Sequence, residues 1–571
     1  MAFLAIAGSA SDASAEGRRK LDRALRQAID SSHDGPTYQV IVRAKPGSEA
    51  RLRQQLSEEN KHVVAELPAS GAVTLELSAQ DLLRWSESNA VESISLDADV
   101  VPTGAPPTAG GGGSSSTPST LLATLGITPT ASGGAGVTVA LIDSGIYPSK
   151  AFSGRIKAFY DFTNGQSAVR KAFDDYGHGT HIAGLIGGSQ SSQDSQYQGI
   201  APSVQFVVLR VLDWTGRGKT SDVIRAIDFV TANAGPDKLG IDIINLSLGH
   251  PIFEAAATDP LVLAVERASA AGLTVIVSAG NFGSNPETHA TGYAGTSSPG
   301  NAPSAITAGA FDDAGTVARG DDRVTAYSSR GPTWFDGFAK PDFVAPGHNL
   351  VSESGPRTAL SESYPQQLRV GPSGKVFISL SGTSMAAGVA TGVVALMKQA
   401  AGPQRALLTS NIVKGLLQFT AVPLHDAGAG VYDTLTQGTG GINAAGALHL
   451  VRNINFAHTD TSSAWTSLVR CSMQISACTS SIGGAPYTWA ANIVWGENLV
   501  RGDSVFFPLS AWAQNIVWGE NIVWGENIVW GENIVWGENI VWGENIVWGE
   551  DTIVWGEFAM WGNAGFQGSR K

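Results

Sequence analysis

Four short, largely apolar runs constrain the fold of this 571-residue chain more than any other feature of its sequence. They occupy residues 137–142, 204–209, 241–245 and 273–277, and helical patterns separate them. Apolar strands that alternate with helices are typical of a parallel sheet covered on both faces, because both faces of each strand must then be buried. We therefore predict a three-layer α/β domain over residues 121–453.

Composition excludes several classes of protein. The length suggests three or four structural units, and 43% hydrophobic against 15% charged residues indicates a globular chain. A formal net charge of −13, without a Lys/Arg-rich stripe, argues against nucleic acid as a partner. The longest apolar helix expected, over residues 385–397, is too short to cross a bilayer, so no transmembrane segment is predicted.

A smaller unit is predicted ahead of this domain, over residues 38–102. Its strand-like runs and its polar, capped helical runs follow the order strand, helix, strand, strand, helix, strand. The strands are predicted at 38–42, 62–67, 72–77 and 91–96, with one helix from 47 to 59 and another beginning at 78–81. Two β-α-β halves of this kind form a ferredoxin-like sandwich.

The segments on either side of the sandwich have no globular pattern. Residues 1–37 begin with a short apolar run followed by small residues, which is compatible with a targeting leader. Residues 103–120 are rich in Pro, Gly, Ser and Thr, and we predict a flexible linker there, where a protease would cut.

Four polar residues stand where an open parallel sheet places its site. Asp143 follows the first apolar run, Asn281 follows the fourth, and His178 and Ser384 each open a helical pattern. Together they supply a hydroxyl nucleophile, a base, a carboxylate to orient the base and a donor for an oxyanion. Taken singly, each has an ordinary explanation as a turn residue or a helix cap.

The segments that carry these residues resemble those of the subtilisin-like serine peptidases, whose triad has the chain order Asp, His, Ser. The matching segments are Asp143-Ser144-Gly145, Gly177-His178-Gly179-Thr180-His181, Ser278-Ala279-Gly280-Asn281 and Gly382-Thr383-Ser384-Met385-Ala386. The resemblance implies a three-layer, parallel-sheet catalytic domain over residues 121–453. It also implies that the sandwich is an inhibitory propeptide.

Further site residues are carried over by the resemblance alone. Ser247, Leu248 and Gly249 match the strand that borders the pocket for the residue before the cut, with Ala279 and Gly280 beside it. Gly216, Arg217 and Gly218 match the opposite substrate-pairing edge. Binding between two such edges reads the peptide backbone, which predicts broad specificity. If Arg217 faces the groove, an acidic residue a few positions before the cut should be favoured.

Other polar residues near the expected site have different explanations. We interpret His181 as a packed helix residue and Asp175 as solvated or calcium-linked. No cofactor is required. Calcium is familiar in this family, but the sequence contains no acidic ligand cluster with clear spacing, so the metal ligands stay unknown.

The end of the chain has a different character. Residues 454–514 form an extension in which Cys471 and Cys478 suit one disulfide in an oxidising compartment, with two free thiols as the alternative. The hexapeptide Asn-Ile-Val-Trp-Gly-Glu is repeated within residues 515–557, and a tail covers 558–571. We predict either a β-roll-like solenoid or an expanded repeat without a fold. Such a tail could bind a surface, self-associate or be removed.

The sequence therefore predicts a secreted or envelope-associated serine endopeptidase that matures by self-cleavage. Its partners would be polypeptide substrates and its own propeptide, with residues 97–102 in the cleft and the cut between 98 and 120. Two alternatives stay open: a pseudoprotease that acts as a binding module, and a structural or adhesive protein whose repeat tail is the working part.

Overall fold

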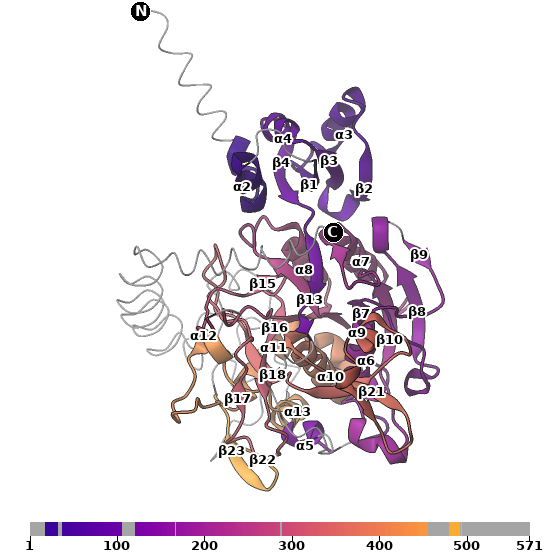
Figure 1. Ribbon diagram of the computed structural model, residues 1–571, viewed down its shortest axis with the longest axis vertical. Helices are drawn as coiled ribbons and strands as arrows, with labels where there is room; N and C mark the ends of the chain where they lie inside the picture. The colour runs from indigo at the N-terminus through magenta and orange to yellow at the C-terminus, as the bar shows by residue number, and fades with distance from the viewer. Residues whose placement is uncertain are drawn as a thin grey trace, which may run out of the picture.

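A computed structural model describes residues 17–31, 37–105, 120–454 (apart from 129, 166, 286 and 287), 479–491 and 493. In Figure 1 a small N-terminal unit stands on a larger body, and one strand descends from the first into the second. The predicted linker beyond residue 105, the cysteine pair and the hexapeptide repeats lie outside the described residues.

The small unit has the predicted sandwich architecture. Its strands β1 (Tyr38–Ala44), β2 (Val63–Leu67), β3 (Ala72–Leu77) and β4 (Val91–Leu96) form an antiparallel sheet in the order β2-β3-β1-β4. One face of the sheet is covered by α3 (Glu49–Glu58) and α4 (Ala79–Ser86), whose apolar side chains share a core with the strands. The side chain of Ser78 accepts a hydrogen bond from the Asp81 N–H and so begins α4 as predicted.

Part of the range predicted as a leader, 1–37, is folded. Helix α2 (Arg23–Ser31) packs on the sandwich, with Leu21 and Leu25 buried in its core. The N–H of Arg23 donates to the carbonyl of Phe253, so the helix also contacts the larger body. The leader prediction for 1–16 and 32–36 lies outside the described residues.

The larger body contains the predicted parallel sheet. In spatial order its parallel strands are β8 (Ile156–Asp161), β10 (Gln205–Arg210), β7 (Thr138–Asp143), β12 (Ile243–Leu246), β14 (Thr274–Ser278), β16 (Ile306–Asp312) and β18 (Phe343–Pro346). The antiparallel strands β9 (Ala168–Val169) and β17 (Arg323–Val324) extend it. The four predicted runs became the neighbouring strands β10, β7, β12 and β14.

Helices cover both faces of this sheet. Helices α6 (His178–Gly187), α10 (Thr383–Ala401), α11 (Ser410–Thr420) and α13 (Ala444–Asn453) share one core with the inward side chains of the strands. Helices α7 (Thr220–Asn233) and α8 (Pro260–Ala270) share a second core on the other face. The result is the predicted three-layer arrangement (Figure 1).

Shorter elements complete the described part of the chain. The helices are α5 (Leu121–Thr124), α9 (Ala359–Ser363) and α12 (Thr434–Gln437), and the strands are β5 (Asp99–Pro102), β6 (Gly104–Ala105), β11 (Gly218–Lys219), β13 (Leu248–Pro251), β15 (Ser297–Ser298), β19 (Leu350–Glu353), β20 (Leu368–Val370), β21 (Val376–Gly382), β22 (Thr479–Ile482) and β23 (Ala485–Thr488).

Helix α10 is longer than the predicted apolar run 385–397. With the turn that follows it, residues Thr383–Leu407 are long and apolar enough to cross a membrane, but 83% of the most apolar stretch is buried inside the protein. Its apolar surface therefore serves the central packing between sheet and helices.

Part of the predicted C-terminal extension, 454–514, packs on the body. The β22–β23 hairpin is followed by Trp489 and Ile493, which are buried in the same core as α10 and α13. The indole N–H of Trp489 donates to Ser480 Oγ at 2.9 Å. These described residues belong to the catalytic body rather than to a separate unit.

Candidate active site

Asp143 and His178 are in direct contact. Asp143 ends β7 and is fully buried, and Nδ1 of His178 lies 2.8 Å and 3.0 Å from its two carboxylate oxygens. The helix that begins at His178 comes unusually close to the strand end, since a Cβ on Gly179 would lie 2.2 Å from the Gly145 carbonyl oxygen. Gly177 precedes it with φ +105°, a backbone conformation that disfavours other residues. The Gly-His-Gly order thus permits the contact.

Asp174 fixes the first turn of α6. Its buried carboxylate accepts hydrogen bonds from the N–H groups of Gly177 (2.7 Å) and Thr180 (2.9 Å) and from Ser144 Oγ (3.0 Å). Burial raises the pKa of this carboxyl, while these hydrogen bonds act in the opposite direction. Asp174 is not among the residues predicted from the sequence, although an acidic residue just before a helix start is a usual capping signal.

Ser384 lies in the first turn of α10 and is fully buried. Its hydroxyl donates to the carbonyl of Ser247 at 2.8 Å and lies 2.8 Å from Thr103 Oγ1. Among the described residues, Nε2 of His178 is buried and has no hydrogen-bond partner. The hydroxyl of Ser384 therefore makes no hydrogen bond to the imidazole of His178 in this arrangement.

The carbonyl of Thr103 lies between two donors. Nδ2 of Asn281 donates to it at 2.6 Å and the N–H of Ser384 at 3.2 Å. The Asn281 carbonyl oxygen accepts from the N–H and hydroxyl of Thr383, both at 3.1 Å, which fixes the amide orientation. The Thr103 hydroxyl donates to Ser278 Oγ at 2.5 Å.

Strand β5 lies extended between the two predicted substrate edges. Its Val101 and Pro102 are opposite Gly249 and Leu248 of β13, and its Val100 is opposite Gly218 of β11. Thr103 continues the ladder by donating its N–H to the Ser247 carbonyl at 3.3 Å. Residues 97–102 are predicted to lie in the cleft, and the chain continues through the cleft beyond residue 102.

The residues after Thr103 also lie in the cleft. Gly104 and Ala105, in β6, pair with Gly382 and Ser381 at the end of β21. The range predicted as linker, 103–120, therefore begins with a bend at Thr103 and the two-residue strand β6, both in the cleft. Residues 106–119 lie outside the described part of the chain.

The remaining predicted substrate residues support the cleft in other ways. The N–H of Gly280 donates to Thr383 Oγ1 at 3.1 Å, and the carbonyl of Ala279 accepts from Ser297 N–H at 2.9 Å. Gly216 has φ +77° and packs so closely on the Tyr176 ring that a Cβ would lie 2.4 Å from it. Arg217 Nη1 lies 3.7 Å from the carboxylate of Asp99.

His181 and Asp175, two polar residues near the site, lie in different environments. His181 is fully buried, its Nε2 lies 3.0 Å from the Leu350 carbonyl and burial lowers its pKa to about 3, which fits a packed helix residue. Asp175 is not simply solvated, because it pairs with Arg210 at 3.0 Å. Within the described residues no group of three or more His, Cys, Asp or Glu could hold a metal ion, and calcium stays a prediction.

Comparison with known proteins decides the family. The model of the subtilase family matches residues 134–445, which is more than half of the chain and contains Asp143, His178, Asn281 and Ser384. The chain belongs to the subtilase family.

Individual subtilases give the extent of the similarity. Serine protease AprX of Bacillus subtilis (strain 168) is 38% identical over 314 residues, 54% of this chain and 66% of AprX. Subtilisin DY of Bacillus licheniformis is 30% identical over 52% of this chain and 86% of its own length. Pyrolysin of Pyrococcus furiosus is 31% identical, with 22% of its length covered. The chain thus spans less than two thirds of the length of AprX and of pyrolysin.

A solved structure agrees on the fold. Fervidolysin from Fervidobacterium pennivorans, described as a keratinolytic enzyme related to subtilisin, superposes with a TM-score of 0.54 at 21% identity and covers 73% of this chain and 62% of its own. The subtilisin-like α/β fold with a parallel sheet is therefore confirmed.

Proposed function

We propose that this subtilase is a serine endopeptidase that is made as a precursor and cuts its own chain between Thr103 and Gly104. The observation that carries the proposal is the carbonyl of Thr103, which receives hydrogen bonds from the Ser384 N–H and the Asn281 amide. Two such donors are what a tetrahedral oxyanion requires. The peptide on both sides of this carbonyl is held in extended form, as a substrate would be.

The proposed chemistry uses four side chains. Ser384 Oγ adds to the carbonyl carbon of Thr103 and gives its proton to Nε2 of His178, while Asp143 orients the imidazole through Nδ1 and stabilises its charged form. The C–N bond to Gly104 then breaks as His178 returns the proton to the leaving nitrogen. A water, deprotonated by His178, cleaves the resulting acyl-enzyme and releases Ser384.

One rearrangement must precede attack. The Ser384 hydroxyl is bonded to the Ser247 carbonyl, and Nε2 of His178 has no partner among the described residues. A rotation of the Ser384 side chain toward His178 would form the nucleophile–base hydrogen bond. The described arrangement therefore corresponds to a resting precursor, with the substrate carbonyl already in place.

We further propose that the sandwich remains bound as an inhibitor after the cut. The carboxylate of Asp97 accepts hydrogen bonds from the N–H (2.8 Å) and the hydroxyl (2.7 Å) of Ser221, at the start of α7. The carbonyl of Ala98 accepts from the N–H of Thr220 at 3.0 Å. These bonds do not depend on the Thr103–Gly104 linkage, so cleavage leaves them intact and β5 stays in the cleft.

Secretion is part of the same proposal. It is supported by the apolar run near residue 5 with small residues after it, and by Cys471 and Cys478, whose number and spacing suit one disulfide. Attachment to the cell envelope would fall to the repeat tail, residues 515–557. Fractionation of cells that express the chain tests both statements.

The decisive experiment compares the wild type with Ser384→Ala. The wild type should yield a fragment beginning at Gly104, identified by N-terminal sequencing, and should cleave casein. Ser384→Ala should stay at full length and be inactive. Ser191→Ala, at an exposed serine whose hydroxyl donates to Asp194, is the matched control and should be processed normally. Processing of purified Ser384→Ala at the same bond would overturn the proposal.

A further inference from the structure

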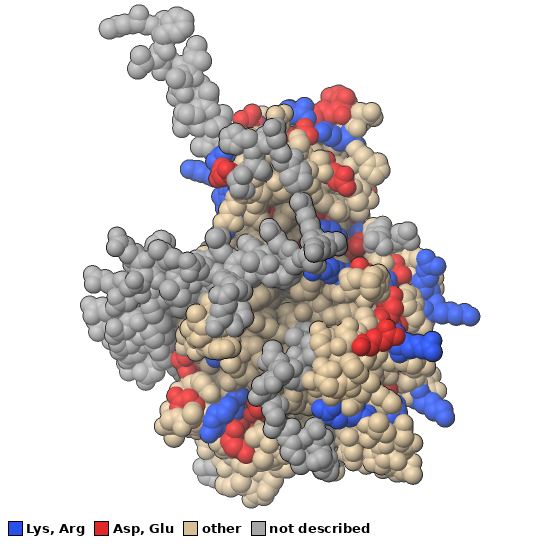
Figure 2. Space-filling model, in the orientation of Figure 1, with Lys and Arg blue, Asp and Glu red and all other residues tan. Residues whose placement is uncertain are grey.

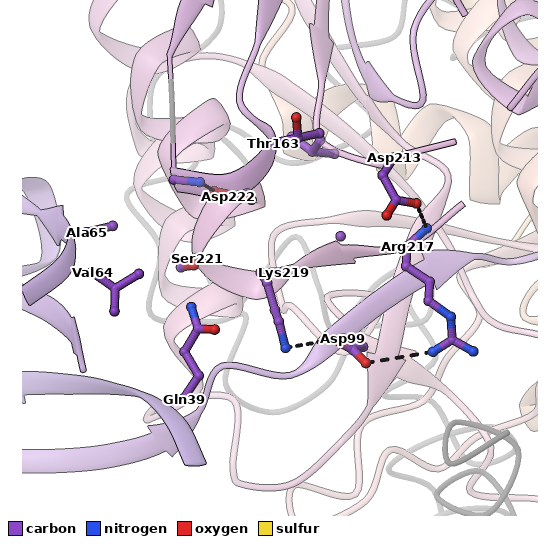
Figure 3. A pocket seen from close by; sticks show the side chains of 13 residues that line it. Gln39, Val64, Ala65, Asp99, Thr163, Asp213, Arg217, Lys219, Ser221 and Asp222 are labelled. Atoms are coloured by element: carbon purple, nitrogen blue, oxygen red, sulfur yellow. Dashed lines mark hydrogen bonds and ion pairs between the residues drawn. The ribbon is translucent and has the colours of Figure 1, made fainter. Parts of the chain in front are cut away.

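A cavity lies beside the strand that occupies the cleft. It measures about 310 Å³ and is bordered by Asp99 of β5, by Arg217 and Lys219 on either side of Gly218, and by Gln39, Val64 and Ala65 of the sandwich. In Figure 3 the sandwich residues approach from one side, while Lys219 and Arg217 both point toward the Asp99 carboxylate. Removing the sandwich would take away the Gln39, Val64 and Ala65 side of this cavity, while both cations belong to the larger body.

Two cations converge on one carboxylate. Nζ of Lys219 lies 2.8 Å from one oxygen of Asp99, and Nη1 of Arg217 lies 3.7 Å from the other. Lys219 makes the shorter contact, so its role exceeds that of Arg217, the residue expected from the sequence. The three side chains are about two-fifths exposed, so solvent screens the attraction.

The backbone fixes where these cations act. Gly218 pairs with Val100 and Lys219 with Asp99, so a peptide bound in this register places the residue before its Val100 equivalent directly opposite Lys219. The turn before Gly218 is rigid, because Asp213 Oδ1 accepts from the N–H groups of Thr215 (2.8 Å) and Arg217 (3.1 Å). The Asp213 carboxylate is thereby engaged with the backbone of its own turn.

The charge here is local. Figure 2 shows Lys and Arg interspersed with Asp and Glu on the visible face, without a broad basic region. The visible face therefore does not predict a general attraction for acidic proteins. The two cations beside Asp99 predict a specific site for one carboxylate.

We infer that Lys219 and Arg217 form a specificity subsite for an acidic side chain four residues before the residue whose carbonyl is attacked. This inference rests on the proposed function, since Thr103 defines the attacked carbonyl and Asp99 lies four residues earlier. An incoming substrate strand replaces β5 and presents its own side chain at the same position. The preferred substrates are peptides and loops with Asp or Glu there.

The test uses the processed enzyme and two internally quenched peptides. One has the sequence of residues 97–107, and the other replaces its Asp99 by Asn, which keeps the shape and removes the charge. We expect kcat/KM to be about threefold higher for the Asp peptide at low salt, as exposed ion pairs allow. The ratio should approach one at about 0.5 M salt.

Variants divide the effect between the two cations. Lys219→Gln should remove most of the preference, Arg217→Gln a smaller part, and Lys219→Arg should retain it. Lys238→Gln, at an exposed lysine in the turn after α7, is the control and should keep the full ratio. The salt series on the wild type needs no variant, so it tests the inference even if a variant folds poorly.

The outcomes separate this inference from the proposed function. Equal cleavage of both peptides at low salt overturns the subsite while leaving the peptidase in place. A preference that Lys219→Gln leaves unchanged overturns it as well. If neither peptide is cleaved while casein is, the assignment of the Thr103 bond fails, and if casein is not cleaved either, the proposed peptidase fails.

Discussion

The hydroxyl of Ser384 and the imidazole of His178 depend on each other for activity. Because one supplies the nucleophile and the other accepts its proton, Ser384→Ala and His178→Ala should each lower kcat on the order of a million-fold, as in subtilisin, and the double variant should lose little more. Asn281→Ala should cost about a hundred- to a thousand-fold, since the Ser384 N–H remains as a donor. Steady-state hydrolysis of a small ester substrate measures kcat for all four variants against the wild type. Additive losses in the double variant would contradict the shared role.

Sequence patterns could identify some residues of the site but not others. Asp143, His178, Asn281 and Ser384 stand at strand ends and helix starts, where the topology of a parallel sheet brings them together. Lys219 carries no such signal, because its role appears only once β5 is paired in register with β11. Ser278 is a similar case, since its contact with Thr103 is made across the fold.

Helix α7 begins at the edge of the cleft, and the sandwich supplies the acceptor for its first turn. Asp97 is almost fully buried there and bonds both the N–H and the hydroxyl of Ser221. Asp97→Ala would leave those donors buried and unpaired, which costs about 1–3 kcal/mol, so the sandwich should bind roughly tenfold to a hundredfold more weakly. The lag before activity appears in a processing reaction should shorten accordingly.

Two substitutions control this experiment. Asp97→Asn keeps an acceptor for the Ser221 N–H and should have an intermediate effect. Asp30→Ala removes an exposed carboxylate of α2, the helix packed on the sandwich, where it pairs with the exposed Arg18, and should leave the lag unchanged. A lag in Asp97→Ala equal to that of the wild type would contradict the capping role.

The strands could be predicted from the sequence more accurately than the helices and their ends. β3 and β4 match their predicted ranges, because apolar and polar residues alternate there, and the four buried strands of the body lie within two residues of the predicted runs. Helix α2 was missed because it is short and highly charged, and its helical form depends on packing against β4 and the body. The length of α10 was underestimated, since it continues past Met397 through Lys398, whose ammonium donates to the Leu408 carbonyl.

Across the whole molecule, carboxyl groups are crowded where the sandwich meets the body. Burial raises the pKa of Glu254 to about 8 and that of Asp22 to about 6, with Asp259 adding to both shifts and Arg26 lowering the second. Part of the Glu254 shift comes from the charge of Asp22, which lies in the other unit, so association raises this pKa and takes up protons. Binding is therefore strongest at acidic pH and weakens as the pH rises toward 8, where Glu254 ionises in the complex.

This coupling predicts faster release of the sandwich in alkaline solution. Between pH 6 and pH 8.5 the lag before activity should shorten at least about tenfold, when timed samples are all assayed at one fixed pH. Glu254→Gln should flatten the dependence, because it cannot ionise. Glu76→Gln, an exposed position on β3, should not. An equally steep dependence in Glu254→Gln would show that other groups control release.

The continuous path of the chain through the cleft has a consequence for concentration. In the uncut chain, residues 99–105 join the sandwich covalently to the body, so the local concentration of the sandwich at the cleft is millimolar or higher however dilute the solution is. After the cut, the same surfaces meet as two molecules, and their encounter follows ordinary mass action. Cleavage of one bond would thus make the fraction of enzyme with bound sandwich depend on concentration. The enzyme would stay inhibited at high concentration and become active once it has been diluted into a larger volume.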